Sequence, residues 1–383
     1  MATLFEGATV FDGHQLRQGG LLVDGSRFAG ILPAGERPDG TDAQPLAGGL
    51  LVPGFVDLQV NGGDGVMLND SPTAATIGRM VRAHERLGTL TMLPTLITDR
   101  SEVLRATVDA AVRYLAEGGA GIAGLHLEGP HLSIARKGAH DPALIRPMTE
   151  ADLVALIAAK ARLPHLMVTL APESATPDQI SRLSRAGIVV ALGHTDSGYQ
   201  ACRTAMAAGA TVATHLFNAM SQIGNREPGL AGAVLRSPSC HAGLIADGIH
   251  VDPEVIAVAM QAKAGPGQIF LVTDAMAPAG SDISEFTLNG RTIRRENGRL
   301  TLADGTLAGA DLDMATALRV MTGRVGLALD RALAMATSVP ATVMGIQERA
   351  GYIEAGQSAD FVHLSDDLVV RSVWRGGNRV FQA

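Results

Sequence analysis

Residues 50–60, LLVPGFVDLQV, form a mostly apolar run that gains polar side chains only towards its end, at Asp57 and Gln59. Asn61 follows, so three polar residues stand at two-residue spacing, which a β-strand places on one face. An almost continuous apolar strand of this kind is typical of a parallel sheet that is covered on both faces. The run therefore predicts a buried strand with a carboxylate and two neutral amides along one side.

Similar apolar runs recur along the middle of the chain, separated by segments with helical signals. Thr149-x-x-Asp152 is typical of a helix N-terminus, and the amphipathic segment 178–187, DQISRLSRAG, ends in glycine. Eight buried strands that alternate with helices predict an α/β fold, a (β/α)8 TIM barrel, with an open doubly wound sheet as the alternative. The eight runs are residues 54–60, 90–96, 122–128, 166–173, 188–194, 211–215, 242–247 and 269–274.

The two ends of the chain have a different pattern, of short alternating runs separated by glycine turns. We therefore expect residues 1–52 and 351–383 to meet in one small β domain, with residues 53–350 forming the barrel. Residues 280–308 are expected to form a hairpin-like insertion after the eighth strand, either as a lid over the site or as a decoration of the rim.

The composition bounds the class of protein. The chain has 383 residues, 46% of them hydrophobic and 18% charged, and a formal net charge of -7, which argues against a nucleic-acid partner. No apolar stretch has the roughly 18 residues that a membrane span needs. The N-terminus lacks the basic and apolar regions of a signal peptide, and two cysteines are too few for a disulfide framework. We expect a cytoplasmic protein.

Several predicted strands end in residues that bind metals or transfer protons, and in a barrel these ends share one rim. Glu128, His194 and His215 each close a different run, and two imidazoles with a carboxylate form a known catalytic zinc arrangement. Asp274 closes the eighth run and is a candidate general base and acid. His126 lies two residues before Glu128, so we expect it to support the metal ligands and not to bind the metal itself.

Ten stretches of the chain resemble the N-acetylglucosamine-6-phosphate deacetylases of the amidohydrolase superfamily. They include GLHLEGPHLS, KGAHDP, ALGHTDSGY, THLFNAM, REPGLAGAVL, ADGIHVDP and LVTDAMAPAG, and they occur in the expected order between about Gly49 and Asp360. The resemblance implies a (β/α)8 barrel with a small β-sandwich domain built from both termini. It also implies hydrolysis of the 2-acetamido group of N-acetylglucosamine 6-phosphate to glucosamine 6-phosphate and acetate.

The same resemblance implies roles for residues that the pattern alone leaves open. Glu128, His194 and His215 bind the metal, Asp274 is the general acid/base, and His140 in KGAHDP holds or polarises the acetyl carbonyl. The implied substrate-binding residues are Asn218, Ala219, Arg226 and His250. Arg226, His250 or both are expected to reach across a homodimer interface.

Gln59 and Asn61 stand where many amidohydrolases have two histidines that bind a second metal. Neutral amides are weak zinc ligands, so we expect one tightly bound divalent ion per subunit, with the amides hydrogen-bonded to water or to neighbouring side chains. The ion is most simply Zn²⁺, while Fe²⁺, Co²⁺ and Mn²⁺ suit similar sites.

Three other functions compete with this one. N-acetylgalactosamine 6-phosphate differs from the glucosamine compound only at C4, so its deacetylation is the nearest alternative. A deaminase or cyclic amidase is disfavoured by HLEGP and FNAM, and by Glu173 where a carbamylated lysine would stand. An inactive barrel that only binds ligands would be expected to have lost a metal ligand or the base.

Overall fold

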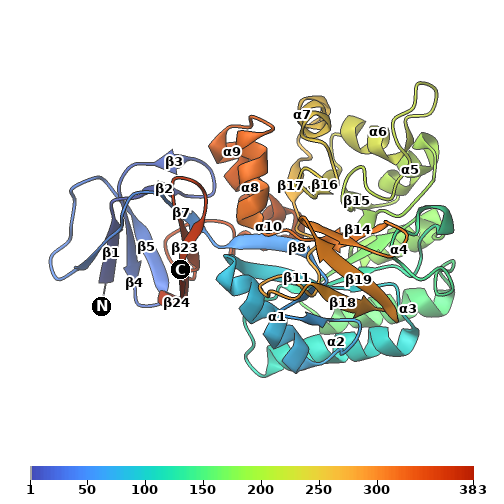
Figure 1. Ribbon diagram of the computed structural model, residues 1–383, viewed down its shortest axis with the longest axis horizontal. Coiled ribbons are helices and arrows are strands. Elements are labelled where there is room, and N and C mark those ends of the chain that lie inside the picture. Colours follow the sequence, from blue (N-terminus) through green and yellow to red (C-terminus); the bar gives the residue numbers. More distant parts are fainter. Residues whose placement is uncertain (1) are drawn as a thin grey trace.

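The computed structural model describes residues 2–383, and its largest unit is a barrel of eight parallel strands (Figure 1). Each of the eight apolar runs overlaps one of these strands. The fold class predicted from the sequence is therefore confirmed, and the open doubly wound sheet is excluded. In order around the barrel the strands are β8 (Phe55–Val60), β11 (Thr89–Ile97), β12 (Gly124–Glu128), β13 (His165–Leu170), β14 (Val189–Leu192), β15 (Ala210–Ala213), β16 (His241–Leu244) and β17 (Ile269–Leu271).

Helices alternate with the strands and surround the barrel. The predicted helix start at Thr149 is a capping box, in which Thr149 and Asp152 each satisfy a backbone N–H of the other. Two further helices, α9 (Leu329–Ala336) and α10 (Ser338–Met344), pack against β17 and β8. The helices that follow the eight strands are α1 (Ala74–Arg86), α2 (Ser101–Ala116), α3 (Glu150–Arg162), α4 (Pro177–Arg185), α5 (Tyr199–Ala207), α6 (Gly229–Arg236), α7 (Pro253–Ala262) and α8 (Met314–Gly323).

The barrel closes between β17 and β8 without a regular ladder of hydrogen bonds. The buried Asp57 carboxylate accepts hydrogen bonds from the hydroxyl and the backbone N–H of Thr273 at this seam. The backbone N–H of Asp274 donates to the Gln59 carbonyl at 3.0 Å, and Val60 and Ala275 form an isolated parallel bridge. Polar contacts of the first strand therefore fix the position of the Thr273–Asp274 segment.

The apolar stretch 50–60 contributes to two different sheets. Residues Leu50–Pro53 form β7, which pairs with the C-terminal strand β22 (Phe361–Leu364), and β8 begins only two residues later in the barrel. The stretch therefore joins the terminal sheets to the barrel.

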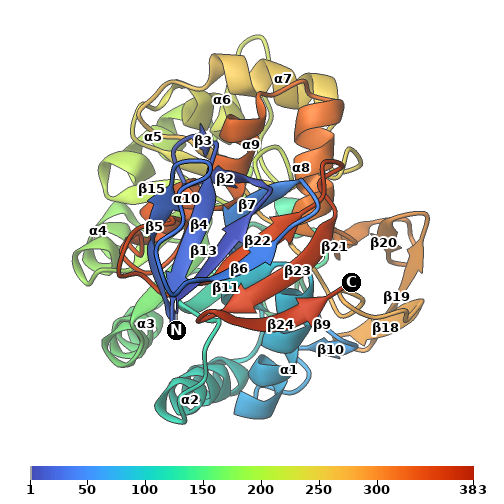
Figure 2. The ribbon, with the colours of Figure 1, turned by 90° about the vertical axis from the view of Figure 1, so that its left-hand side faces the viewer.

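Strands from both chain ends form two sheets beside the barrel (Figures 1 and 2). Phe5 on one sheet packs edge-on against Phe361 and Trp374 on the other, with ring centroids 5.0 and 5.2 Å apart. The predicted small domain of both termini is thus present, while its boundaries at residues 52 and 351 remain a proposed division. One sheet has the order β5 (Arg27–Leu32), β4 (Gly20–Asp24), β1 (Ala2–Glu6), β6 (Asp42–Pro45); the other has β24 (Asn378–Gln382), β23 (Val370–Arg375), β22, β7, β2 (Thr9–Phe11), β3 (Leu16–Arg17).

The segment after β17 is a four-stranded antiparallel sheet, larger than the expected hairpin-like insertion. Its strands are β18 (Glu285–Leu288), β19 (Arg291–Glu296), β20 (Arg299–Thr301) and β21 (Leu307–Ala310). Leu288, Ile293 and Leu300 are fully buried in an apolar cluster with Ile97 and Met276 of the barrel rim. The sheet therefore packs against the rim of the barrel through these apolar side chains.

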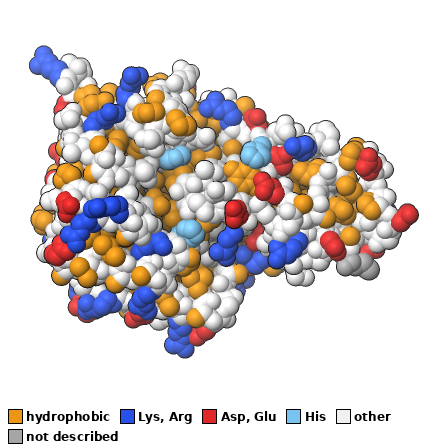
Figure 3. Space-filling view, turned by 180° about the vertical axis from the view of Figure 1, so that it is seen from behind, with side chains coloured by type: hydrophobic (Ala, Val, Ile, Leu, Met, Phe, Trp, Pro, Cys, Tyr) orange, Lys and Arg blue, Asp and Glu red, His pale blue; other side chains and the backbone are white. Residues whose placement is uncertain are grey.

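Acidic and basic side chains are interspersed on the face shown in Figure 3, in keeping with the modest net charge. Among residues 2–383, no helix has the combined length and hydropathy that crossing a membrane requires.

Candidate active site

Four strands bring the predicted chemical groups to the carboxyl end of the barrel. Glu128 is the last residue of β12, and His194 and His215 each come two residues after a strand. Asp274 comes three residues after β17. At most 9% of any of these residues is exposed. Residues that are as far as 146 positions apart in the sequence therefore meet in one buried site.

Backbone strain marks the same strand ends. His194, His215 and Asp274 have φ angles of 47°, 31° and 51°, in the left-handed region that side chains other than glycine rarely adopt. Phe217 and Ala219, in the loop after β15, have φ angles of 73° and 47°. Such conformations persist only where surrounding contacts fix them, and they concentrate at functional sites.

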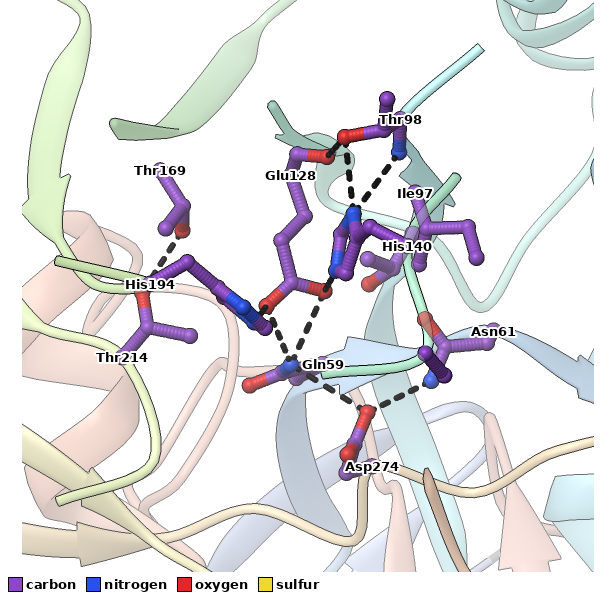
Figure 4. A network of polar contacts seen from close by, with 12 residues as sticks. Gln59, Asn61, Ile97, Thr98, Glu128, His140, Thr169, His194, Thr214 and Asp274 are labelled. Atoms are coloured by element: carbon purple, nitrogen blue, oxygen red, sulfur yellow. Dashed lines mark hydrogen bonds and ion pairs between the residues drawn. The ribbon is translucent and has the colours of Figure 1, made fainter. Parts of the chain in front are cut away.

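The three predicted metal ligands converge on one point, and Figure 4 shows two of them, Glu128 and His194. Nε2 of His194 and Nε2 of His215 each lie 3.1 Å from Oε1 of Glu128, and they lie 3.1 Å from each other. A carboxylate oxygen and two imidazole nitrogens in this arrangement form the donor set of a catalytic zinc site with one position left for water. These residues fit a divalent metal ion.

The protonation states of His194 and Glu128 suit the binding of a cation. Nδ1 of His194 lies 2.8 Å from the Arg136 carbonyl, which only accepts, so this nitrogen carries the ring proton and Nε2 offers a lone pair. Burial alone would raise the pKa of Glu128, but its contacts with the His194 and His215 imidazoles hold that pKa well below its usual range. Glu128 is therefore anionic, as a ligand for a cation would need to be.

Gln59 and Asn61 point their amide nitrogens at the two carboxylates (Figure 4). Gln59 Nε2 lies 3.2 and 3.3 Å from the oxygens of Glu128 and 3.2 Å from Oδ1 of Asp274, and Asn61 Nδ2 lies 2.6 Å from the same Oδ1. An amide nitrogen only donates, so neither residue presents its oxygen to the ligand cluster in these contacts. The arrangement is in keeping with hydrogen-bonding amides beside a single metal site.

Asp274 has the properties of a proton carrier. Burial and the nearby negative charge of Glu128 raise its pKa to about 6. Its Oδ1 already accepts hydrogen bonds from Gln59 and Asn61, which leaves Oδ2 as the basic oxygen. A carboxyl group whose pKa lies near neutrality can both take up and release a proton during a reaction.

The buried His140 ring lies beside the cluster, with Nε2 4.0 Å from Oε2 of Glu128. Its Nδ1 contacts Thr98, a residue that was not predicted from the sequence. Burial lowers the pKa of His140 to about 3, so the ring is neutral. Thr98 directly follows β11, and the same search for polar residues at strand ends would have found it.

His126 contacts threonines and not the predicted metal ligands. Its Nε2 lies 2.7 Å from Thr169 Oγ1, and its Nδ1 lies 3.4 Å from Thr95 Oγ1. Burial lowers its pKa to about 4. His126 is thus a neutral residue of the barrel interior whose ring hydrogen-bonds to threonines, and its expected support of the metal ligands stays a prediction.

A cavity of about 360 Å³ opens at the cluster, and three of the four implied substrate-binding residues line it: Asn218, Ala219 and His250. His250 is oriented by Asp247, whose Oδ2 lies 2.6 Å from Nδ1 of the ring. One wall is apolar and is formed by Ile97, Met276, Leu288 and Leu307.

Arg226 does not line the cavity of its own chain. It is exposed in the loop between β15 and α6. The arginine that lines the cavity is Arg136, whose guanidinium lies 2.8 Å from Asp196, and it was not predicted from the sequence. Arg136 is at the end of a 3₁₀ turn (Ile134–Arg136) between the HLEGP and KGAH motifs, and this position was the only signal for it.

The chain matches the Amidohydrolase family over residues 50–380. It is 44% identical to an N-acetylgalactosamine-6-phosphate deacetylase of Shewanella over 338 residues, covering 88% of this chain and 85% of that protein. Two solved structures are similar over nearly their whole length. The N-acetylglucosamine-6-phosphate deacetylase of Pasteurella multocida has 34% identity and a TM-score of 0.93, with 99% of each chain covered. A mutant of the Mycobacterium smegmatis enzyme, in complex with N-acetyl-D-glucosamine-6-phosphate, has 36% identity and a TM-score of 0.90, covering 100% of this chain and 99% of that one.

The barrel and its ligand cluster define a hydrolase of the metal-dependent amidohydrolase type. The chain belongs to the amidohydrolase family, and within it to the group that contains the N-acetylglucosamine-6-phosphate deacetylases. The resemblance noted from the sequence motifs and the hydrolytic class are confirmed.

We expect one divalent ion per chain, because one complete donor set is present and the amides of Gln59 and Asn61 are weak ligands. His194→Ala should lose this ion, whereas His126→Gln, a buried-histidine control outside the cluster, should keep it. Elemental analysis of the purified proteins after zinc loading measures both. Two ions per active chain, or a metal-free His126→Gln variant, would contradict the assignment.

Proposed function

We propose that the protein hydrolyses the acetamido group of N-acetylglucosamine 6-phosphate, giving glucosamine 6-phosphate and acetate. The observation that carries this proposal is the meeting of Glu128, His194 and His215 with a buried carboxylate, Asp274, in one cavity. The similarity to deacetylases of phosphorylated amino sugars supports the substrate class.

The proposed reaction divides its steps among residues of the cavity. Glu128, His194 and His215 would hold a divalent ion, which when bound would supply the Lewis acidity that makes a water nucleophilic near neutral pH. Asp274 accepts the proton of the attacking water as a general base. His140 donates a hydrogen bond from Nε2 to the acetyl oxygen as negative charge develops there.

Asp274 then gives the proton to the sugar nitrogen, so that the carbon–nitrogen bond breaks with an amine as the leaving group and acetate as the second product. Asn218, Ala219 and His250 line the cavity and are proposed to hold the sugar. Glu128, His140 and Asp274 are buried, and preorganised hydrogen bonds from buried groups to the reacting atoms are stronger than they would be in bulk solvent.

We propose zinc as the ion, because two imidazoles and one carboxylate are ligands that zinc prefers. Iron, cobalt and manganese suit similar donors, and metal availability often decides between them. The cytoplasmic location stays a prediction from the sequence.

The galacto epimer is the second candidate substrate, favoured by the 44% identity to an N-acetylgalactosamine-6-phosphate deacetylase. We expect acetate release from N-acetylglucosamine 6-phosphate by the zinc-loaded protein, and less from the galacto epimer. Measurement of kcat/KM for both sugars decides between them. A higher kcat/KM for the galacto epimer would make N-acetylgalactosamine 6-phosphate the preferred substrate. No turnover of either by fully metallated protein would remove the proposed function and favour a barrel that only binds ligands.

Asp274→Asn tests the proton carrier. The amide keeps the shape of the side chain but cannot accept the proton, so we expect kcat to fall by about three orders of magnitude or more. Metal content and the dissociation constant for substrate should change little. These are measured by elemental analysis and by calorimetry with the unreacted sugar phosphate. A kcat within tenfold of the unmodified protein would refute the assigned role of Asp274.

We further propose a homodimer in which the exposed Arg226 of one subunit binds the substrate phosphate in the cavity of the other. An arginine fork provides two N–H donors for a phosphate, and Arg226 lies outside the cavity of its own chain. His250 lines the cavity of its own chain, so it does not need a second subunit to reach the site.

Mixed dimers test this arrangement. Arg226→Ala should raise KM about tenfold or more, and Asp274→Asn should abolish turnover. If Arg226 acts across the interface, unfolding and refolding the two variants together creates dimers with one intact site, and activity at low substrate concentration returns. Activity no greater than the sum of the two separate variants would place Arg226 in its own subunit's site or outside any site.

A further inference from the structure

Thr98 holds one nitrogen of the His140 ring through two groups (Figure 4). Thr98 is 1% exposed and directly follows β11. Its backbone N–H donates to Nδ1 of His140 at 3.3 Å, and its Oγ1 lies 2.7 Å from the same nitrogen. The other acceptor within reach of this hydroxyl is the Glu128 carbonyl oxygen, at the longer distance of 3.4 Å.

These contacts determine which nitrogen of the neutral ring carries the proton. A backbone N–H only donates, so Nδ1 must accept and cannot itself be protonated. The Thr98 hydroxyl is then the second donor to Nδ1. The proton of the neutral ring is on Nε2, which lies 4.0 Å from Glu128 Oε2, beyond hydrogen-bonding distance. Since His140 lines the cavity, this N–H is available to a bound substrate.

We propose that Thr98 is a positioning residue, which holds His140 as the Nε2–H tautomer and aims that N–H at the acetyl carbonyl of the substrate. The proposal rests on the proposed function, in which His140 polarises this carbonyl. In the opposite tautomer, the lone pair of Nε2 would face the carbonyl oxygen and would repel the charge that develops there.

Gly129, in the HLEGP motif, gives a second and independent observation. A Cβ atom at this position would lie 2.2 Å from Thr98 Oγ1, which is closer than nonbonded atoms approach. Its φ angle of 88° also lies in a region that favours glycine. Gly129, next to the proposed metal ligand Glu128, thus leaves the space that the Thr98 hydroxyl occupies. This explains why a glycine stands at this position of the HLEGP motif.

Thr98→Val and Thr98→Ser separate the hydroxyl from the shape of the side chain. Valine has the same shape without the hydroxyl, and serine keeps the hydroxyl. For zinc-loaded Thr98→Val we expect kcat to fall about tenfold, the loss of roughly one hydrogen bond, with little change in KM or metal content. Thr98→Ser should retain most of the activity. Thr107→Val is the matched control, because Thr107 is also fully buried but its hydroxyl bonds only within α2, to the Val103 carbonyl.

The tautomer itself is observed by nitrogen NMR of the zinc-loaded protein with ¹⁵N-labelled histidine, where accepting and protonated ring nitrogens resonate separately. We expect His140 to show a protonated Nε2 in the unmodified protein and in the serine variant, and a mixture of tautomers in Thr98→Val. An Nδ1–H tautomer in the unmodified protein, or a valine variant with unchanged tautomer and unchanged kcat, would overturn the proposal.

His140→Ala distinguishes this outcome from a failure of the proposed function. If His140→Ala keeps a normal kcat, His140 does not act on the substrate, and the catalytic role proposed for Thr98 falls with it. If His140→Ala loses turnover while Thr98→Val changes neither tautomer nor kcat, the role of His140 stands and only that of Thr98 is rejected.

Discussion

The buried carboxylate of Glu128 is the group on which the rest of the site depends. It is 2% exposed, and an ionised carboxylate at such a depth is stable only where charges or donors surround it. Its partners come from three other strands: Gln59 from β8, His194 after β14 and His215 after β15. Each partner requires its strand end in place, so the barrel must close before the carboxylate is satisfied. The site and the closed barrel therefore stabilise each other.

The amides of Gln59 and Asn61 solve the electrostatic problem that a second carboxylate creates. Asp274 lies near Glu128, and two buried negative charges repel each other, which contributes to the raised pKa of Asp274. A second metal ion would remove this repulsion, but it would also lower that pKa and weaken Asp274 as a base. Neutral N–H donors stabilise the ionised form more weakly and leave its pKa near neutrality. Gln59 and Asn61 stand where many amidohydrolases have histidines. Their neutral amides are thus consistent with a base that works beside one metal ion.

The sequence predicted the barrel well because eight apolar runs alternate with helical segments and six of the runs end in a polar residue, and a closed parallel sheet brings such ends together. It predicted Thr98 and Arg136 poorly because their significance lies in what they contact. Thr98 matters through the two donors that it directs at one ring nitrogen. The predicted boundary between residues 52 and 53, with the first barrel run beginning at residue 54, lies close to the break between β7 and β8 at Pro53 and Gly54. The sequence predicted a hairpin-like insertion after β17 but not all four strands of the sheet there, because short strands rich in polar residues, such as β19, show little apolar pattern.

The groups proposed for catalysis are buried in the cavity, whereas the arginines that could bind the substrate phosphate lie nearer the surface. In the proposed reaction the reacting atoms lie among buried groups whose backbone is strained. Moving one of these side chains would break several contacts together. The cations available for a phosphate lie at the surface: Arg136 is paired with Asp196, and Arg226 is on an exposed loop. A phosphate held at the rim would contribute equally to binding of the substrate and of the transition state, because its charge does not change in the reaction. Both candidate sugars carry this phosphate and differ only at C4, so the choice between them would depend on contacts to the C4 hydroxyl, outside the proposed catalytic groups.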